Sequence, residues 1–123
     1  MYGEQAFYVY ILTNKSYGIY YTGVTSDLVV RIYQHRNHIF KSSFSDKYNL
    51  DKLVWYEQYR DVNFAIKREK LIKRWRRAWK EKLIEDFNPN WLDLWEDITI
   101  SRPYIPPPME YYDKIMKEFQ EKT

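Results

Sequence analysis

Two tyrosines, an arginine and a histidine stand close together in the first third of the chain. The stretch Tyr8–His35 reads YVYILTNKSYGIYYTGVTSDLVVRIYQH. Tyr10 and Tyr21 fall in two short aromatic and β-branched runs that a turn separates, whereas Arg31 and His35 lie four positions apart in the next segment. Phenols and cationic side chains that meet at one place can bind an anion and move a proton beside it. This stretch is therefore a candidate active site.

The positions of the two cationic residues leave two interpretations open. At helical spacing, Leu28, Ile32 and Ile39 form an apolar stripe, and Arg31 and His35 lie within or beside it. A cationic group at the rim of a core needs an acidic or phosphate partner. Arg31 is therefore either a ligand for a phosphate or a structural arginine that is paired with a carboxylate at the edge of the core.

Three runs of aromatic and β-branched residues predict the strands that position these side chains, at residues 7–13, 19–24 and 53–59. Residues 14–18 supply a turn, so the first two strands form a hairpin. Gly23 near the end of the second strand indicates either a close backbone approach or a bulge. Thr25, Ser26 and Asp27 are candidate N-caps for a helix. Residues 40–52 read as an irregular loop.

A long helical pattern follows the third strand. Asp61 is its expected N-cap, and apolar residues recur at helical spacing to residue 87, namely Ala65, Ile72, Trp75, Trp79 and Leu83. The stripe broadens near residues 75–77, where the helix could break. Trp75 and Trp79 could stack on nucleic-acid bases, but their place on the stripe favours core packing. Asn88-Pro89-Asn90 ends the pattern.

These elements predict an α+β fold, with a small three-stranded antiparallel sheet flanked by helices and a C-terminal helical tail. The expected domain covers residues 1–97, and a proline-rich linker follows at 98–108. Within residues 109–123, Met109, Tyr112, Met116 and Phe119 predict a short amphipathic helix that docks on the domain or on a second copy, which would make a homodimer.

The charge of the chain is divided unevenly. Residues 1–84 hold 16 Lys and Arg against 8 Asp and Glu, and residues 85–123 hold 4 against 9. Nine of the basic residues and two acidic ones lie in the segment 67–82. A body this basic suits a polyanion, although a cationic solvated surface is the plain alternative. Glu69 stands out within this segment as a carboxylate that should stay ionised as a metal ligand or ion-pair partner.

Composition excludes several other classes of protein. The chain has no cysteine, so it has no disulfide framework, no cysteine zinc site and no thiol nucleophile. With two histidines in the chain, we expect no all-histidine metal site. No apolar run approaches the roughly 20 residues of a membrane span, and no signal peptide is evident. We expect a cytoplasmic protein that does not enter a membrane.

With these residues assembled, the chain resembles the GIY-YIG nuclease superfamily, and in particular its small stand-alone bacterial members, which resemble the N-terminal nuclease domain of the excision-repair endonuclease. The resemblance covers about residues 7–94. Its two motifs are Tyr8-Val9-Tyr10 and Tyr21-Thr22-Gly23, whereas the letters GIY at residues 18–20 are not the first motif. Val9 and Thr22 replace the usual isoleucines. Val30 stands where small members often have a first arginine.

The resemblance implies a metal-dependent endonuclease that hydrolyses DNA phosphodiester bonds, in repair or recombination. By motif position, the catalytic residues are Tyr10, Tyr21, Arg31, His35 and Glu69. Gly23 and Asn88 support them. Glu69 is the implied ligand of a single Mg²⁺ or Mn²⁺ ion. Arg31 would hold the phosphate, and Tyr10 or Tyr21 would activate water with a lowered pKa, assisted by His35. The expected DNA-binding residues are Lys41, Lys47, Lys67, Lys70, Lys73, Arg74, Arg76 and Arg77.

Two further hypotheses remain. The chain could be a nucleic-acid-binding module that keeps this fold with weak or no catalysis. Alternatively, the acidic C-terminal part could compete with DNA for the basic body or mediate dimer formation.

Overall fold

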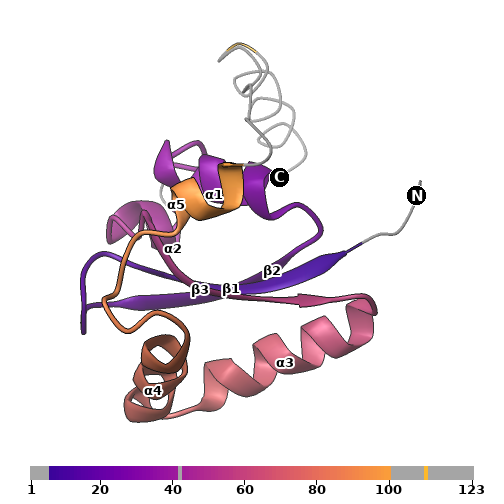
Figure 1. The fold of residues 1–123 in the computed structure, drawn as a ribbon. Helices are drawn as coiled ribbons and strands as arrows, with labels where there is room; N and C mark the ends of the chain where they lie inside the picture. The colour runs from indigo at the N-terminus through magenta and orange to yellow at the C-terminus, as the bar shows by residue number, and fades with distance from the viewer. Residues whose placement is uncertain (1–5, 42, 101–109, 111–123) are drawn as a thin grey trace.

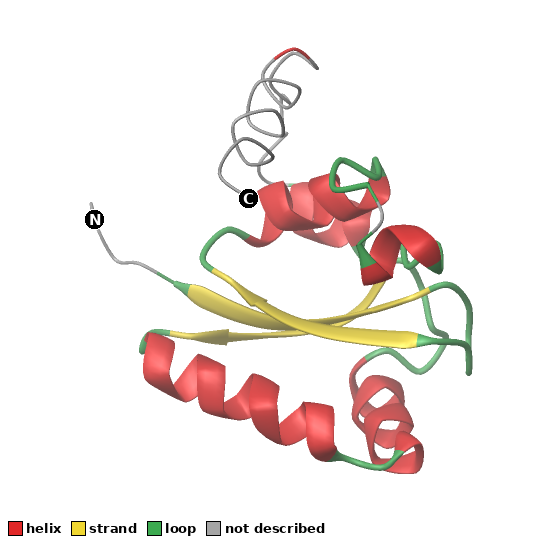
Figure 2. Ribbon diagram, turned by 180° about the vertical axis from the view of Figure 1, so that it is seen from behind, coloured by secondary structure: helices red, strands yellow, loops and turns green. Residues whose placement is uncertain are grey.

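A three-stranded antiparallel sheet separates two layers of helices in the computed structural model (Figure 1), which describes residues 6–41, 43–100 and Glu110. The strands are β1 (Phe7–Thr13), β2 (Tyr20–Thr25) and β3 (Lys52–Tyr59). The helices are α1 (Leu28–Arg36), α2 (Phe44–Lys47), α3 (Val62–Arg74), α4 (Arg77–Phe87) and α5 (Trp95–Thr99). Helices α1, α2 and α5 cover one face of the sheet, and α3 and α4 cover the other (Figures 1 and 2). The predicted α+β fold is confirmed.

The order of the strands is β2-β1-β3, so β1 is central and β2 is an edge strand. Both pairings are antiparallel, and Tyr10 lies opposite Gly23 on β2 and Tyr56 on β3. A register shift between Ile11 and Leu12 interrupts the β1–β3 ladder. Because side chains alternate between the faces of a strand, the sheet sends one set of residues toward each helical layer.

Each face of the sheet has its own hydrophobic core. Val9 and Ile11 of β1 pack with Ala65 and Ile72 of α3 and with Ile84 of α4. Tyr10 and Leu12, which alternate with these residues along β1, pack on the other face. Their cluster also contains Leu28, Ile32, Leu50 and Leu53. The predicted apolar stripes of α1 and α3 are therefore the faces that these helices turn to the sheet.

The helix ends follow the capping residues of the sequence. Asp27 caps α1 by accepting a hydrogen bond from the backbone N–H of Val30 at 3.2 Å. Asp61 caps α3 in the same way, through the N–H of Asn63 at 2.7 Å. Helix α4 ends at Phe87, immediately before the predicted Asn-Pro-Asn stop.

The helices depart from the sequence-based expectation at α2 and at Trp79. The segment 40–52, expected to be irregular, contains α2, which Ser43 caps. The long helical pattern breaks at Trp75 and Arg76, as its broadened stripe suggested, because both residues adopt extended backbone angles. The expected core packing is wrong for Trp79, which is 53% exposed, whereas Trp75 packs against the core.

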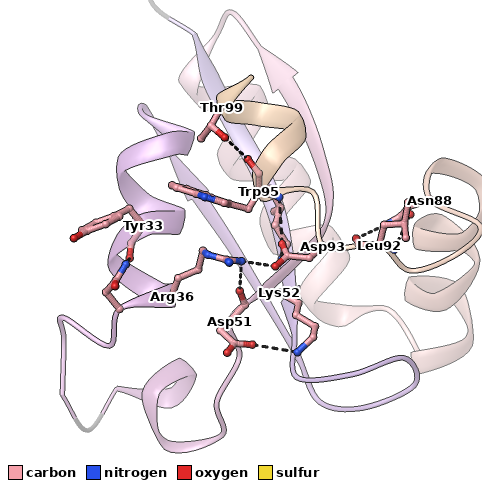
Figure 3. A network of polar contacts seen from close by, with 11 residues as sticks. Tyr33, Arg36, Asp51, Lys52, Asn88, Leu92, Asp93, Trp95 and Thr99 are labelled. Carbon is pink, nitrogen blue, oxygen red and sulfur yellow. Dashed lines mark hydrogen bonds and ion pairs between the residues drawn. The ribbon is translucent and has the colours of Figure 1, made fainter. Parts of the chain in front are cut away.

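A polar network joins α1 and α5 on one face of the sheet (Figure 3). The Arg36 guanidinium on α1 pairs with Asp93, the residue that precedes α5 by two positions. Asp93 also accepts hydrogen bonds from the backbone N–H groups of Leu53 at 3.3 Å and Trp95 at 3.2 Å. One carboxylate therefore connects α1, β3 and the start of α5.

The expected linker and C-terminal helix, with any dimer they form, lie outside the described residues apart from Glu110. Helix α5 extends to Thr99, two residues beyond the expected domain end at residue 97. Within the described residues, no helix is long and apolar enough to span a membrane.

Candidate active site

The site is built on the alternation of side chains along the hairpin. Tyr10 on β1 and Tyr21 on β2 both turn toward the layer that contains α1, and their ring centroids lie 6.2 Å apart. Gly23, opposite Tyr10, makes this arrangement possible, because a β-carbon there would lie 2.5 Å from the Tyr10 hydroxyl oxygen. The glycine therefore allows the Tyr10 ring to cross the edge strand, which is the close approach considered from the sequence.

His35 lies between α1 and the sheet and is bonded through both ring nitrogens. Its Nε2 is 3.0 Å from the Tyr10 hydroxyl oxygen, and its Nδ1 is 2.8 Å from the Ser45 hydroxyl oxygen on α2. Burial lowers the pKa of His35 to about 4, with a smaller contribution from the positive charge of Arg31. His35 is therefore a neutral imidazole near pH 7.

Arg31 lies one turn before His35 on the same helix, and its contacts among the described residues are with polar and aromatic side chains. Its Nη1 donates to Gln34 Oε1 at 3.2 Å, and its guanidinium stacks on Phe40 with the carbon Cζ 5.4 Å from the ring centroid. Burial acts to lower the pKa of Arg31, but the phenols of Tyr10 and Tyr21 act in the other direction and raise it overall. The group is therefore fully charged.

The alternative of a structural ion pair at Arg31 finds no support among the described residues. Each ion pair found among the described residues joins other side chains, and Arg31 takes part in none of them. A half-buried guanidinium without a carboxylate partner is costly to desolvate. An anionic ligand would offset this cost.

A pocket of about 120 Å³ opens beside this guanidinium. Tyr21, Arg31 and His35 line it together with residues of the 34–46 segment, which are Gln34, His38, Phe40, Ser43, Phe44, Ser45 and Asp46. On that side His38 Nδ1 is 2.9 Å from Asp46 Oδ1. The pocket has the charge and donors to accept a phosphate group, and it leaves Tyr21 facing the ligand.

The two tyrosines have different environments. Tyr10 is only 1% exposed, and burial raises its pKa well above the usual range, with a further contribution from Tyr21. Arg31 acts to lower this pKa but does not offset the burial. The expectation of a lowered pKa is therefore wrong for Tyr10. Tyr21 is partly exposed in the pocket, and this makes it the better placed of the two to contact a water molecule.

Glu69 lies in the other helical layer, on α3. Its side chain is 12% exposed, and its Oε1 is 3.1 Å from Lys73 Nζ on the next turn. No described hydrogen bond or ion pair links Glu69 to Tyr10, Tyr21 or Arg31. Helix α3, which carries Glu69, packs against β1 and β2 on the face of the sheet opposite to α1. The sequence-based role of Glu69 stays a prediction.

Glu69 is compatible with a divalent cation of the Mg²⁺ type. The described residues contain no group of three or more His, Asp or Glu that could hold a metal ion. A single carboxylate is nevertheless sufficient for Mg²⁺, which keeps several water ligands and takes others from substrate phosphates. Lys73 would have to release the carboxylate when the ion binds.

Asn88 has a structural environment at the end of α4. Its side-chain amide donates to the Val54 carbonyl at 3.1 Å and the Leu92 carbonyl at 2.8 Å, and its Oδ1 accepts from the Leu92 N–H at 3.0 Å. The buried side chain therefore connects β3 to the turn after α4, away from the pocket. Its supporting role in catalysis stays a prediction.

The predicted DNA-binding residues fall into two groups. Lys41 and Lys47 are exposed near the pocket, on the side of α1 and α2. The other group lies on α3, α4 and the turn between them, on the opposite side of the sheet (Figure 2), and consists of Lys67, Lys70, Lys73, Arg74, Arg76 and Arg77.

Arg77 differs from the others in this second group because its guanidinium already forms bonds within the protein. It donates to the carbonyls of Tyr17 at 2.8 Å and Gly18 at 2.6 Å. Its Nη2 also lies 3.2 Å from Glu81. Its predicted contact with DNA would compete with these bonds.

Sequence reasoning missed the contribution of α2, and above all Ser45. A four-residue helix is too short for a periodic pattern, but Ser43 followed by Asp46 at the third position is the spacing of an N-cap and could have indicated it. The hydrogen bond between Ser45 and His35 joins residues that are ten positions apart, and no sequence pattern indicates it.

Comparison with protein-family models gives a match over residues 6–82 to the GIY-YIG catalytic domain. The match covers more than half of the 123 residues, so the chain belongs to the GIY-YIG family. No curated protein and no solved structure matches the chain.

Membership of this family places the chain among the nucleases, which act on nucleic acids and belong to the hydrolases. Nucleases of this family generally depend on a divalent metal ion. The sequence-based resemblance is therefore confirmed at the level of the family.

Proposed function

We propose that the protein is a divalent-metal-dependent endonuclease that hydrolyses phosphodiester bonds in DNA. The observation that carries this proposal is the half-buried Arg31, which lies beside two phenols and a neutral imidazole and has no acidic partner in the described residues. A phosphodiester would satisfy this guanidinium with charge-assisted hydrogen bonds. A role in repair or recombination stays a prediction.

In the proposed reaction, Arg31 binds the scissile phosphate and stabilises the charge that develops on its oxygens. Tyr21 faces the pocket, so it can orient the attacking water, and as the phenolate, whose negative charge Arg31 stabilises, it accepts a proton from that water and becomes the neutral phenol. Tyr10, buried and bonded to His35, holds the imidazole in place instead of acting as the base. Glu69 would hold the metal ion, which when bound stabilises the leaving oxygen.

A plasmid-nicking assay with Mg²⁺ tests the proposal. The wild type should convert supercoiled DNA to the nicked form, and Glu69→Gln should lose at least about a hundredfold in rate, since it keeps the shape of the side chain but removes a charged metal ligand. Glu96→Gln, which makes the same change on the exposed side of α5, should leave the rate unaltered.

Arg31→Lys separates binding from catalysis in the same assay. Lysine keeps the positive charge but lacks the planar fork that matches two phosphate oxygens. We expect the rate of nicking to fall more than the affinity for DNA. A wild type that binds DNA without nicking it under Mg²⁺ or Mn²⁺ would contradict the proposed activity and favour a binding module.

A further inference from the structure

A chain of largely buried polar groups begins at the wall of the pocket, where His35 and Ser45 line it, and continues to Tyr10. It connects Tyr10 on β1, His35 on α1 and Ser45 on α2, with distances of 3.0 Å and 2.8 Å on the two sides of the imidazole. The three side chains are 1%, 9% and 5% exposed, so water has little access to these bonds. Each ring nitrogen of His35 therefore depends on its one protein partner.

The imidazole couples the hydroxyl groups on its two sides. A neutral imidazole has one N–H, so one ring nitrogen donates and the other accepts. If Ser45 donates to Nδ1, the proton lies on Nε2 and points at Tyr10. If Ser45 accepts from Nδ1, Nε2 accepts the hydroxyl proton of Tyr10. The orientation of the Ser45 hydroxyl therefore determines whether Tyr10 gives or receives a proton in its bond to His35.

Ser45 is itself held firmly in α2. The carbonyl of Ser45 accepts from the Leu50 N–H at 2.8 Å, and its hydroxyl oxygen lies 3.3 Å from that of Ser43. Ser43 is the N-cap of the helix and accepts from the Asp46 N–H at 3.2 Å. The short helix α2 thus presents one hydroxyl to His35 at a fixed position.

We propose that Ser45 is a positioning residue of the active site, which fixes His35 in a single tautomer and thereby sets the direction of the Tyr10 hydroxyl. The proposal rests on the proposed function only for its effect on catalysis. The role assigned to Ser45 acts through His35 and Tyr10. This role accounts for the contact between the four-residue helix α2 and the His35 ring.

The tautomer can be measured directly in the full-length protein by ¹⁵N NMR of the His35 ring at pH 7. The wild type should show one protonated and one unprotonated ring nitrogen. Ser45→Ala and the closer-sized Ser45→Cys, which has only a weak hydrogen-bonding group, should show a mixture or the other tautomer. Ser45→Thr, which restores the hydroxyl, should return the wild-type spectrum. A wild-type tautomer retained in folded Ser45→Ala or Ser45→Cys would overturn the proposal.

The nicking assay then tests the catalytic consequence. We expect Ser45→Ala to lower the rate on the order of tenfold or more, since a misplaced group in an active site can cost about 10²-fold. Ser45→Thr should recover most of the rate. A changed tautomer with an unchanged rate would overturn the catalytic part of the role. If the wild type does not nick DNA, the proposed function fails, whereas the NMR result still decides whether Ser45 sets the tautomer.

Discussion

The Tyr10 ring on β1 fills the space beside Gly23 on β2, where any other residue at position 23 would place its β-carbon. The ring atoms nearest to that position are Cζ and the hydroxyl oxygen, each 2.5 Å from it. The same hydroxyl is bonded to His35. Gly23 therefore leaves the space that the Tyr10 ring needs to reach His35.

Gly23→Ala should displace the Tyr10 ring and weaken its bond to His35. We expect a loss of about 1–3 kcal/mol in the free energy of unfolding, which is typical of an overpacked site. Urea denaturation measures this change. In a Tyr10→Leu background the penalty should shrink, since the clashing ring is absent, and the difference is a coupling energy between the two residues. An equal penalty in both backgrounds would show that the clash with Tyr10 is not the cause.

His35 makes the stability of the fold depend on pH. Burial and then Arg31 lower its pKa to about 4 in the folded state, against about 6.5 when unfolded. Below about pH 6.5 the unfolded chain therefore binds a proton at His35 that the folded chain does not bind. The contribution of His35 to stability is fully present above about pH 6.5 and is lost as the pH falls toward 4. Between pH 7 and pH 5 this histidine should account for roughly 2 kcal/mol of lost stability.

Urea denaturation at the two pH values, applied to the wild type and to His35→Gln, isolates this contribution. Glutamine retains hydrogen-bonding groups but does not titrate, so its stability should fall by roughly 2 kcal/mol less than that of the wild type over the same range. The same pH dependence in both proteins would mean that His35 is not held as a buried neutral ring.

At the scale of secondary structure, α4 holds the turn of the β1–β2 hairpin in place. Tyr17 donates a hydrogen bond to Glu85 at 2.5 Å, and Tyr20 donates to Glu81 at 2.6 Å. Arg77 completes the contact with its bonds to the turn carbonyls, and its guanidinium carbon lies 4.6 Å from the centre of the Tyr20 ring. Helix α4 thereby anchors the hairpin that carries Tyr10 and Tyr21.

Arg77→Ala should destabilise this contact by about 1–2 kcal/mol, because hydrogen bonds from a charged donor are among the stronger ones and this donor is half exposed. Arg76→Ala is the matched control. It removes the same charge from the adjacent residue, whose guanidinium stacks on the exposed Trp79 and bonds nothing in the hairpin. Thermal unfolding of the two variants should show the larger effect for Arg77. Equal losses would mean that α4 does not hold the turn.

The longer elements could be predicted from the sequence, and the shortest could not. The strands and α1 have enough residues for their period to be visible, and their caps mark the boundaries. Helix α2 occupies a single turn within a polar segment, so no period arises. The break after α3 has neither glycine nor proline to mark it, and only the broadened apolar stripe near Trp75 indicated it.

At the scale of the whole molecule, the sequence predicted the part of the site that is local in the chain. Tyr10, Tyr21, Arg31 and His35 come from one hairpin and the helix that follows, so strand alternation and helical spacing were sufficient to bring them together. The pKa of Tyr10 depends on burial by distant residues, which no local pattern reports. The position of Glu69 relative to the pocket depends on how α3 packs across β1 and β2.

The sheet separates the basic residues into two groups on opposite faces, which limits how many of them one DNA duplex can contact. The pocket opens on the side of α1 and α2, where Lys41 and Lys47 are exposed. Lys67 and Arg74 are exposed on α3, in the opposite layer, and a spacing of seven places them on the same side of that helix. A duplex bound with one phosphate at Arg31 should therefore lie closer to the first pair than to the second.

The salt dependence of DNA binding distinguishes the two pairs, because log K falls with log salt by about 0.9 for each phosphate contacted. We expect the double variant Lys41→Ala with Lys47→Ala to reduce this slope by about 2. Lys67→Ala with Arg74→Ala removes the same charge and should reduce the slope less. Fluorescence anisotropy with a labelled duplex over a range of salt concentrations gives both slopes. An equal or larger reduction for the α3 pair would instead place the duplex across the basic helices, because counterion release counts phosphate contacts wherever they lie on the protein.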